Sequence, residues 1–481
     1  MSLIQVQHLT FGYDGSYELI FDDASFVLDT HFKTALIGRN ARGKTTLLKL
    51  MMHEYEYQGQ IMIHEKCCYF PYEVKNPQLL TLDVCYEIEP SLENWRLEKE
   101  LRLLGMDAMD VFYRPFETLS HGEQTKVLLA ILFLKEHSFL LIDEPTNHLD
   151  QDSRLKIGEY LKRQKGFLLV SHVRYFIDSC CDHVMAINPQ SIDVVNGNFS
   201  SWYEDKTKKD EREMMLNKKL KKDIVKMESS KRQKQNWGYQ IEKSKKGAVD
   251  KGYVGHMAAK MMKRSRAIEK RQQQAIEKKK TLLKDIEEYD DLKIHCLKYF
   301  QNQILQFQHF SLSYDHHQIF EDLSLTIHQH DRILLKGPNG CGKSSLIRFI
   351  LGEKIEYDGQ YICGSQLKIS YVPQDCTFLS GQLDDWIEQC HSDLTLVKTL
   401  LRKLGFSREH FDIPLEKLSQ GQKKKVMLAI SLASPAHLYI WDEPLNYIDI
   451  FSRIQIEQAI LTYQPTLLFV EHDQYFQEDC D

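Results

Sequence analysis

Two short glycine-rich stretches contain the residue types that bind phosphate. GRNARGKTT spans residues 38–46, GPNGCGKSS spans residues 337–345, and both fit the pattern GxxxxGK[ST]. Glycines let backbone N–H groups approach phosphate oxygens, and the N-terminus of the following helix adds its positive dipole. The pattern predicts that Lys44 and Lys343 reach the β- and γ-phosphates of a nucleotide and that Thr45 and Ser344 bind Mg²⁺.

An Asp-Glu pair follows each of these stretches. Asp143 and Asp442 end apolar runs with the character of buried strands, where a carboxylate can hold Mg²⁺. Glu144 and Glu443 come next, and we expect them to orient or activate the attacking water. An isolated Asp-Glu pair is also common at a solvated strand end, but the phosphate-binding patterns upstream favour the catalytic interpretation.

The two sets of residues belong to an internal repeat. Lys44 and Lys343 are 299 residues apart, as are Asp143 and Asp442, so the spacing within each half is the same. VSHV at 170–173 returns as VEHD at 470–473. A lone histidine is more often structural, but these matching positions favour γ-phosphate contacts for His172 and His472. The chain is therefore predicted to be a tandem duplication with one insert.

Each half must supply the strands and helices that position these residues. Apolar runs enter both glycine-rich stretches at 35–37 and 333–335, and helical spacing follows them, which predicts strand, loop and helix. Further short apolar runs at 139–143, 167–170, 438–442 and 466–470 resemble buried strands. Strands that alternate with helices predict a mostly parallel α/β sheet in each half. We expect domains at 1–200 and 301–481 and a linker at 201–300.

The linker has a different composition from the rest of the chain. Residues 201–290 contain 26 Lys and Arg against 15 Asp and Glu, although the whole chain has a net charge of −6. Helical spacing at 216–227, spacing by seven at 261–282 and glycines at 247, 252 and 255 predict a coiled-coil hairpin with its tip near 240–256. Such charge can mark a solvated helix face, but the asymmetry favours a polyanionic partner.

Together these motifs resemble the ATP-binding cassette superfamily, with LSHGE at 119–123 and LSQGQ at 418–422 as its signature loops. The resemblance implies two cassettes that face head to tail, each ATP lying between one P-loop and the signature loop of the other cassette. It pairs Lys44 with Ser419, and Lys343 with Ser120. The implied cofactors are ATP and Mg²⁺. The implied nucleotide-binding residues are Tyr13, Gly38, Asn40, Gly43, Lys44, Thr45, Thr46, Ser120, Gly122, Glu123, Tyr314, Gly337, Asn339, Gly340, Gly342, Lys343, Ser344, Ser345, Ser419, Gly421 and Gln422. The implied metal ligands are Thr45, Asp143, Ser344, Gln374 and Asp442.

Several positions depart from the pattern of that superfamily. Tyr72 stands where Gln is usual, whereas Gln374 is kept in the second half. Ala41 replaces a loop glycine, and Val173 follows His172 where Asp is common. These departures put the equivalence of the two sites in doubt. Both glutamates remain, so hydrolysis is still expected.

Composition limits the classes of protein that remain consistent with these motifs. Hydrophobic residues make up 42% of the chain, and the apolar run at 127–134 is too short to span a bilayer. The N-terminus lacks the pattern of a secretory signal. The 11 Cys include no CxxC pair, which favours a reducing compartment. Two classes remain: the ATPase pair of a transporter, or a soluble ABC-F protein. A DNA-repair ATPase is less consistent, because it would carry a much longer coiled coil.

The linker favours the ABC-F class, whose members bind ribosomes. The motifs GRNARGKTT, RPF at 114–116, MMKRS at 261–265 and WDEPLNYID at 441–449 resemble the Lsa/Vga-type antibiotic-resistance proteins. That resemblance implies a cytoplasmic monomer that enters the tRNA exit site of the 70S ribosome, near 23S rRNA and P-site tRNA, without a membrane partner. It also implies protection from lincosamides, pleuromutilins and streptogramin A. A housekeeping ABC-F translation factor is the alternative. The predicted RNA-binding tip comprises Lys243, Lys245, Lys246, Lys251, Tyr253 and His256.

Overall fold

The fold is described from a computed structural model of the 481-residue chain. It describes residues 2–13, 19–146, 149, 151–188, 191–244, 291–314, 317–337, 340–471 and 476. Residues 1–200 and 289–481 form one compact unit, and residues 201–288 form a second. Both predicted nucleotide-binding halves therefore fall in the first unit. The proposed domain boundaries at 200 and 300 stay predictions.

The first half contains a mixed sheet with the strand order β5-β6-β7-β3-β8-β9. Its strands are β5 (Lys66–Phe70), β6 (Ser138–Asp143), β7 (Phe167–Val170), β3 (Lys33–Ile37), β8 (His183–Ile187) and β9 (Ile192–Asn196). Neighbouring strands from β5 to β8 are parallel, and β9 pairs with β8 in the antiparallel sense. The carboxyl ends of β3, β6 and β7 lead into the predicted site residues.

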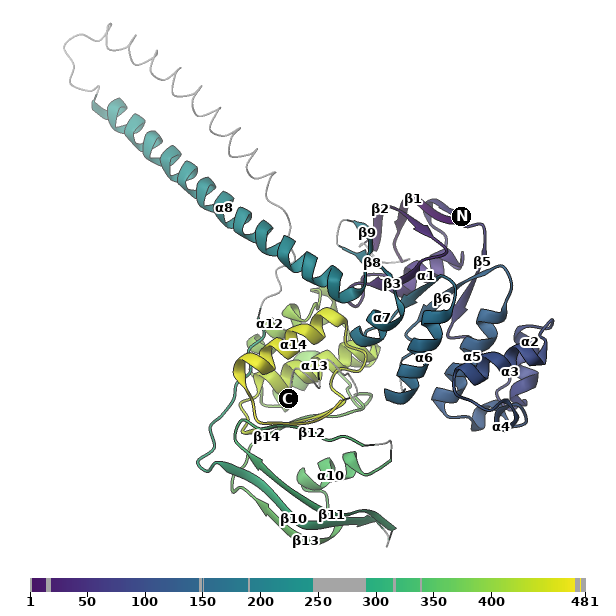
Figure 1. Cartoon of the computed structure of the whole chain (residues 1–481). Helices are drawn as coiled ribbons and strands as arrows, with labels where there is room; N and C mark the ends of the chain where they lie inside the picture. The colour runs from purple at the N-terminus through teal and green to yellow at the C-terminus, as the bar shows by residue number, and fades with distance from the viewer. Residues whose placement is uncertain are drawn as a thin grey trace. The chain divides into compact units, whose positions relative to one another are not determined.

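A second, antiparallel sheet in this half has the order β2-β1-β4. It consists of β1 (Leu3–Phe11), β2 (Phe21–Asp29) and β4 (Gln58–Met62). The helices are α1 (Lys44–Met51), α2 (Thr81–Ile88), α3 (Asn94–Leu103), α4 (Ala108–Phe112), α5 (His121–Leu134), α6 (Gln151–Arg163) and α7 (Arg174–Cys180), with a 3₁₀ turn η1 (Phe116–Thr118). Helices α2, α3 and α4 gather at one end of this half, away from β1 and β2 (Figure 1).

The second half repeats this plan. A parallel sheet has the order β12-β16-β15-β14, and an antiparallel sheet has the order β11-β10-β13. The strands are β10 (Gln303–Tyr314), β11 (His317–His328), β12 (Arg332–Leu334), β13 (Glu356–Cys363), β14 (Ile369–Val372), β15 (Leu438–Asp442) and β16 (Leu467–Val470). The helices are α10 (Lys343–Ile350), α11 (Leu383–Gln389), α12 (Leu394–Lys403), α13 (Gln420–Ala433) and α14 (Ile450–Tyr463), with 3₁₀ turns η3 (Glu409–Phe411) and η4 (Leu415–Lys417). The predicted duplication and parallel α/β sheets are confirmed.

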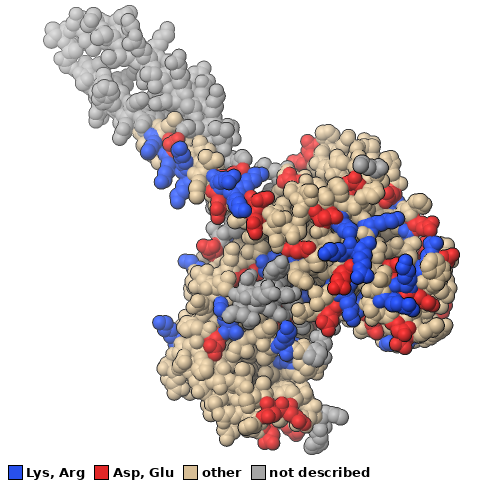
Figure 2. Space-filling view, viewed as in Figure 1, with Lys and Arg blue, Asp and Glu red and all other residues tan. Residues whose placement is uncertain are grey.

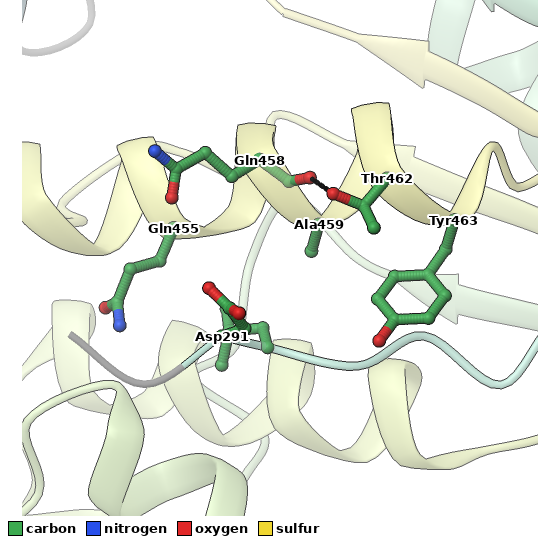
Figure 3. Close-up of a pocket in the computed structure, with 7 residues that line it drawn as sticks. Asp291, Gln455, Gln458, Ala459, Thr462 and Tyr463 are labelled. Carbon is green, nitrogen blue, oxygen red and sulfur yellow. Dashed lines mark hydrogen bonds between the residues drawn. The ribbon is translucent and has the colours of Figure 1, made fainter.

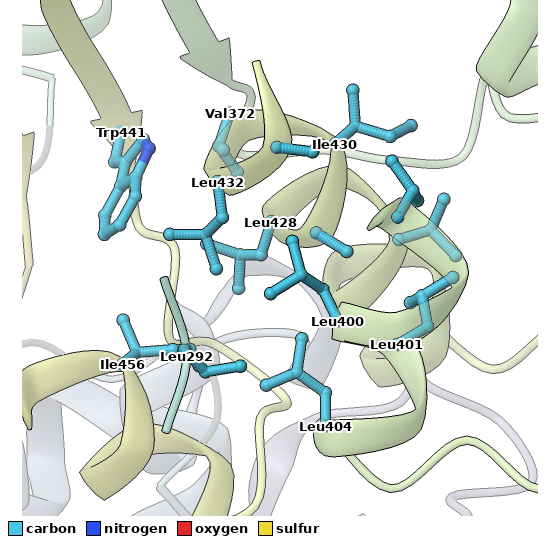
Figure 4. Close-up of a cluster of buried hydrophobic side chains, with 14 of the residues drawn as sticks. Leu292, Val372, Leu400, Leu401, Leu404, Leu428, Ile430, Leu432, Trp441 and Ile456 are labelled. Carbon is cyan, nitrogen blue, oxygen red and sulfur yellow. The ribbon is translucent and has the colours of Figure 1, made fainter. Parts of the chain in front are cut away.

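One apolar core of the second half packs α12, α13 and α14 against β14 and β15 (Figure 4). Leu400, Leu428 and Ile456 contribute from the three helices, and Val372 and Trp441 contribute from the two strands. The Trp441 indole Nε1 donates a hydrogen bond to Ser431 Oγ at 3.0 Å. Burial of these side chains removes apolar surface from water and holds the carboxyl end of β15 against α13. This packing fixes the place of the Asp-Glu pair that ends β15.

The first part of the linker is a long helix, α8 (Phe199–Ser244) (Figure 1). Its first turn is tied down within the first unit, because Ser200 N donates to Asp178 Oδ1 at 3.1 Å. The helical spacing at 216–227 is confirmed. The predicted second helix and most of the tip lie outside the described residues. Within the part of the chain that the structure describes, no helix combines the length and the apolar character needed to cross a membrane.

Candidate functional site: two nucleotide-binding loops

Both glycine-rich loops, called here the first P-loop (38–46) and the second P-loop (337–345), join a parallel strand to a helix. Lys44 begins α1 after β3, and Lys343 begins α10 after β12. The Lys44 ammonium Nζ donates to the carbonyl oxygens of Gly38 at 2.8 Å and Arg39 at 3.2 Å. Lys343 Nζ donates to the Gly337 carbonyl at 2.7 Å. Each lysine thus lies over its own loop, where phosphate oxygens could replace the carbonyl contacts.

Backbone conformation explains why this loop needs glycine before the lysine. Gly43 has φ +84°, and an added Cβ would lie 2.4 Å from Ile20 Cγ2. Gly342 has φ +96° and an equally close neighbour in the other half. The departure at Ala41 does not change the loop conformation, since Ala41 has φ 64° where Gly340 has φ 82°. A non-glycine residue in this left-handed region costs about 1–3 kcal/mol, so the first P-loop is the more strained of the two.

The predicted metal ligands lie together in both halves. Thr45 Oγ1 donates to Asp143 Oδ2 at 2.7 Å, and Ser344 Oγ donates to Asp442 Oδ2 at 3.1 Å. Tyr69 adds a second donor to Asp143 Oδ2, at 3.0 Å. Burial raises the pKa of both aspartates. A bound cation would lower these pKa values again, because it stabilises the carboxylate. A hydroxyl and a carboxylate are oxygen ligands of the kind that Mg²⁺ prefers, so these residues fit the ion.

Glu144 lies next to a histidine in the first half. Glu144 Oε1 is 3.1 Å from His172 Nε2. Burial and the neighbouring Asp143 raise the pKa of Glu144 to about 8, whereas burial lowers the pKa of His172 well below its ordinary value. Burial thus favours the neutral form of both groups, whereas a cation bound close to Glu144 would favour its carboxylate. Sequence reasoning assigned Glu144 to the attacking water and His172 to the γ-phosphate, and their proximity places them in one cluster.

Glu443 has a different neighbour. The Asn446 amide Nδ2 donates to Glu443 Oε2 at 2.5 Å. The backbone is the same in both halves, because Glu144 has φ 51° and Glu443 has φ 46°. Glu144 N and Glu443 N both donate at 2.9 Å to the carbonyl of the residue that ends the neighbouring strand, β7 or β16. Both glutamates thus adopt a left-handed conformation, which is uncommon for residues other than glycine. His472 lies outside the described residues.

The signature loops form the N-termini of two long helices. Ser120 caps α5 and Ser419 caps α13, and each belongs to a capping box. In these boxes Ser120 N donates to Glu123 Oε2 and Ser419 N donates to Gln422 Oε1, both at 2.8 Å. Both signature serines therefore stand at a helix start, where backbone N–H groups can bind an anion. Glu123 and Gln422 hold that start in shape here, and their nucleotide contacts stay predictions.

The first P-loop contacts the second half of the chain. Asn40 Nδ2 donates to the Tyr447 carbonyl at 3.1 Å. A Cβ added to Gly421 would lie 2.4 Å from that carbonyl oxygen and 3.0 Å from Asn40 Nδ2. The first P-loop therefore lies against the signature glycine of the second half, as the head-to-tail arrangement requires. Residues 338 and 339 are outside the described part, so the pairing of the second P-loop with Ser120 stays a prediction.

The two signature glycines should differ in their tolerance of substitution. Gly421→Ala forces a backbone contact apart, and we expect a loss of about 1–3 kcal/mol in unfolding free energy. Gly122→Ala is the matched control, because its Cβ would meet Ser153 Oγ at 3.4 Å, an ordinary contact. Urea denaturation of both variants without nucleotide measures the difference. Equal stability of the two variants would contradict the close contact at Gly421.

The remaining predicted residues are less fully placed. Tyr13 lies beside the P-loop helix, with its hydroxyl 2.9 Å from Thr46 Oγ1 and 43% of its surface exposed. The structure describes only the backbone of Tyr314, which ends β10, and of Lys243 in α8. Gln374 follows β14 and is exposed. Asn339, Lys245, Lys246, Lys251, Tyr253 and His256 lie outside the described residues.

Sequence reasoning missed two ion pairs near the first site, one partly and one fully buried. Arg174 Nη2 lies 2.5 Å from Glu457 Oε1 and connects α7 to α14. Lys425 Nζ lies 2.5 Å from Asp449 Oδ2, and neither side chain is more than 3% exposed. Burial alone would raise the pKa of Asp449, but the Lys425 ammonium holds it well below the ordinary range. Arg174 follows His172 by two residues, and Lys425 comes shortly after the second signature loop. These positions were the only features of the sequence that could have pointed to the two ion pairs.

A separate cavity of about 330 Å³ lies on one side of α14 (Figure 3). Its lining comes from Asp291, Leu292, Gln455, Gln458, Ala459, Thr462 and Tyr463. The Thr462 hydroxyl donates to the Gln458 carbonyl at 2.7 Å. None of the predicted nucleotide-binding residues lines this cavity, so it is distinct from the P-loop sites.

Comparison with known proteins identifies the family. The family model described as "ABC transporter" matches residues 21–147 and 320–446, which together make up more than half of the chain. The chain belongs to the ABC ATPase family. It aligns at 28% identity over 451 residues with the ribosome protection protein VmlR of Bacillus subtilis (strain 168), covering 92% of this chain and 79% of that protein. It aligns at 26% identity over 397 residues with the energy-dependent translational throttle protein EttA of Mycobacterium tuberculosis (strain CDC 1551 / Oshkosh), covering 79% and 66%.

Solved structures agree on the fold. A chain in the complex of archaeal ribosomal stalk protein aP1 and archaeal ribosome recycling factor aABCE1 matches with a TM-score of 0.63 at 17% identity, covering 98% of this chain and 86% of that chain. At this identity the match shows the fold alone. Together with the sequence relatives, which include ABC transporter F family member 2 of Arabidopsis thaliana, the site and fold define an ABC-F ATPase that resembles antibiotic-resistance proteins. The chain hydrolyses ATP.

Proposed function

We propose that this ATPase binds the bacterial ribosome in the cytoplasm and protects its peptidyl transferase centre from lincosamide, pleuromutilin and streptogramin A antibiotics. The observation that carries the proposal is the alignment of 92% of the chain with a ribosome protection protein. The basic insert between the two cassettes supports it, because a transporter ATPase has no need for such a segment. In this proposal the linker tip enters the tRNA exit site, beside 23S rRNA and P-site tRNA, and bound drug leaves.

The residues around the two P-loops account for the coupling of ATP to this action. ATP at the first P-loop would lie between Lys44 and the signature loop that begins at Ser419, so its binding would hold the two cassettes together. Glu144 and Glu443 would accept a proton from the attacking water, and the cassettes would separate after hydrolysis. Because a ligand shifts an equilibrium only by its differential affinity, ATP must bind the closed state more tightly than the open state.

We infer that Mg²⁺ accompanies the nucleotide at both sites. The Thr45–Asp143 and Ser344–Asp442 pairs would hold the ion, and Gln374 is a further predicted ligand at the second site. Bound Mg²⁺ would neutralise charge on the phosphates during transfer. Lys44 and Lys343 would hold the same phosphates from the side of the P-loop.

The linker helix α8 carries positive charge that could bind the phosphates of rRNA. Basic side chains lie beside acidic ones along the part of α8 that Figure 2 draws in colour, and lysines are concentrated in one stretch of this helix. Five of them lie within residues 218–226, against one Asp: Lys218, Lys219, Lys221, Lys222 and Lys226. Ammonium groups at this density can neutralise phosphates and release counterions. This local charge matches the basic character of the whole insert.

Ribosome binding should therefore weaken steeply with salt. Raising salt from 50 to 200 mM should lower the affinity by at least about tenfold. The Lys221→Gln/Lys222→Gln variant should reduce the slope of log affinity against log salt by about one to two. Lys75→Gln/Lys354→Gln, which removes one exposed lysine from each cassette, is the control. Co-sedimentation with 70S ribosomes at several salt concentrations measures the slope for both variants. A slope that the α8 substitutions leave unchanged would show that Lys221 and Lys222 do not contact phosphates.

The decisive experiment is expression in a drug-susceptible Gram-positive host. We expect higher inhibitory concentrations for lincosamides, pleuromutilins and streptogramin A, and no change for a drug that binds the small subunit. Ribosome binding without any change in susceptibility would favour a housekeeping translation factor, the class suggested by the similarity to EttA. Recovery in salt-washed membranes without ribosomes would favour a transporter ATPase.

A further inference from the structure

Lys424 is a buried cation in the second cassette to which sequence reasoning gave no role. It lies in α13, five residues after Ser419, and is 2% exposed. Its Nζ donates to three carbonyl oxygens: Pro373 at 2.6 Å, Gln374 at 3.1 Å and Asp442 at 3.1 Å. An ammonium group has three N–H donors, so these contacts can use all of them.

The three carbonyls belong to two different segments. Pro373 and Gln374 form the turn after β14, and Asp442 ends β15. Asp442 Oδ2 also accepts from Ser344 Oγ, so the strand end that Lys424 binds is the one that faces the P-loop helix. A buried ammonium keeps such partners close, because losing any one of them leaves a charge poorly solvated. Lys424 therefore fixes the position of the Gln374 turn relative to Asp442.

The first cassette has no matching lysine at this position. The constant spacing of 299 places Thr125 opposite Lys424, and a threonine side chain is too short to span two segments. Tyr72 replaces Gln374 there, and the Tyr69 hydroxyl instead donates to Asp143 Oδ2 at 3.0 Å. The two cassettes thus support their aspartates by different groups. In the first cassette the Tyr69 hydroxyl contacts the Asp143 carboxylate. In the second cassette the buried Lys424 ammonium contacts the main-chain carbonyl of Asp442.

We propose that Lys424 is a positioning residue for the second nucleotide site: it holds the Gln374 turn and Asp442 at the separation at which both can approach one magnesium ion. Lys424 itself touches neither nucleotide nor metal. Its effect runs through the main chain of the two predicted ligands. This inference rests on the Mg²⁺-dependent ATP binding proposed above.

The test isolates the second site with Lys44→Ala, which removes the P-loop lysine of the first site. Binding of a fluorescent ATP analogue is titrated with Mg²⁺ in this parent and after adding Lys424→Met or Lys424→Gln. We expect the half-saturating Mg²⁺ concentration to rise about tenfold, as is typical when a group supporting metal ligands is removed. Analogue binding in EDTA should change little, because the P-loop itself is intact, whereas the melting temperature should fall by about a few degrees, because the three carbonyls lose their donor.

Thr125→Met in the same parent is the matched control and should leave the Mg²⁺ titration unchanged. Weaker analogue binding in EDTA, in step with a lower melting temperature, would show a general structural role and overturn the proposal. The same holds if Lys424→Gln, which retains polarity should Lys424→Met fail to fold, titrates like the parent. A parent that binds the analogue equally with and without Mg²⁺ would instead refute the magnesium role on which this inference rests.

Discussion

Replacing Glu144 and Glu443 together by Gln should lower ATP hydrolysis by about 10²–10⁴-fold, the range that a general base contributes. ATP binding should persist, because Lys44, Lys343 and the metal-ligand pairs are unchanged. The variant should then remain in the closed, ATP-bound state and accumulate on ribosomes.

The structure favours a specific chemical effect over misfolding. Gln has nearly the shape of Glu, and its amide oxygen can still accept the hydrogen bond from Asn446 Nδ2 that Glu443 Oε2 accepts at 2.5 Å. At the first site, the Gln amide has nearly the size of the Glu144 carboxyl and fits the same place beside His172 Nε2. The lost property is the ability to accept a proton from water.

Phosphate release and ATP-dependent co-sedimentation with ribosomes measure the two effects. Glu87→Gln/Glu388→Gln is the matched control, since it makes the same chemical change at one exposed residue of each cassette. Hydrolysis at the parental rate would show that the two glutamates are not needed for catalysis. Recovery of the double variant mainly in the ribosome-free fraction, with hydrolysis lost, would contradict ATP-driven ribosome binding.

Shortening the linker at 244–254, or changing Tyr253 to Ala, should abolish antibiotic protection. In residues 231–280 there are 16 Lys and Arg against 4 Asp and Glu, and glycines at 252 and 255 lie on either side of the tyrosine. In the predicted turn, Tyr253 would be able to stack on a base, a contact worth about 1–3 kcal/mol. Nearby lysines would hold the tip on phosphates without reading sequence.

Inhibitory concentrations and ATP hydrolysis separate this effect from a folding defect. The expected result is loss of protection with ATP hydrolysis and melting temperature unchanged. Met215→Ala, at a residue of α8 that is 72% exposed, controls for a change elsewhere in the linker and should protect normally. If protection survives the deletion, α8 or the cassettes must be responsible for antibiotic protection instead of the tip. If Tyr253 packs between two linker helices, Tyr253→Ala should lower the melting temperature.

The sequence by itself determined the repeated architecture. A glycine-rich loop, a signature loop and an Asp-Glu pair at equal spacing in two halves allow few folds, because strands that alternate with helices form a parallel sheet. The parallel pairing of β3, β6 and β7 and the helix that begins at Lys44 were predictable for this reason. The antiparallel sheets were not, since strands such as β13, which is largely exposed, lack a strong buried-strand pattern.

The tertiary structure decided which side chains share an environment. Sequence reasoning assigned Glu144 and His172 separately, but burial brings them to 3.1 Å and shifts both pKa values. It gave Lys424 no role, because a lysine after a signature loop resembles a solvated helix residue. Only the packing of α13 against β14 and β15 buries its ammonium beside the Asp442 carbonyl. Local pattern specifies elements and motifs, whereas contacts between residues far apart in the sequence depend on how those elements pack.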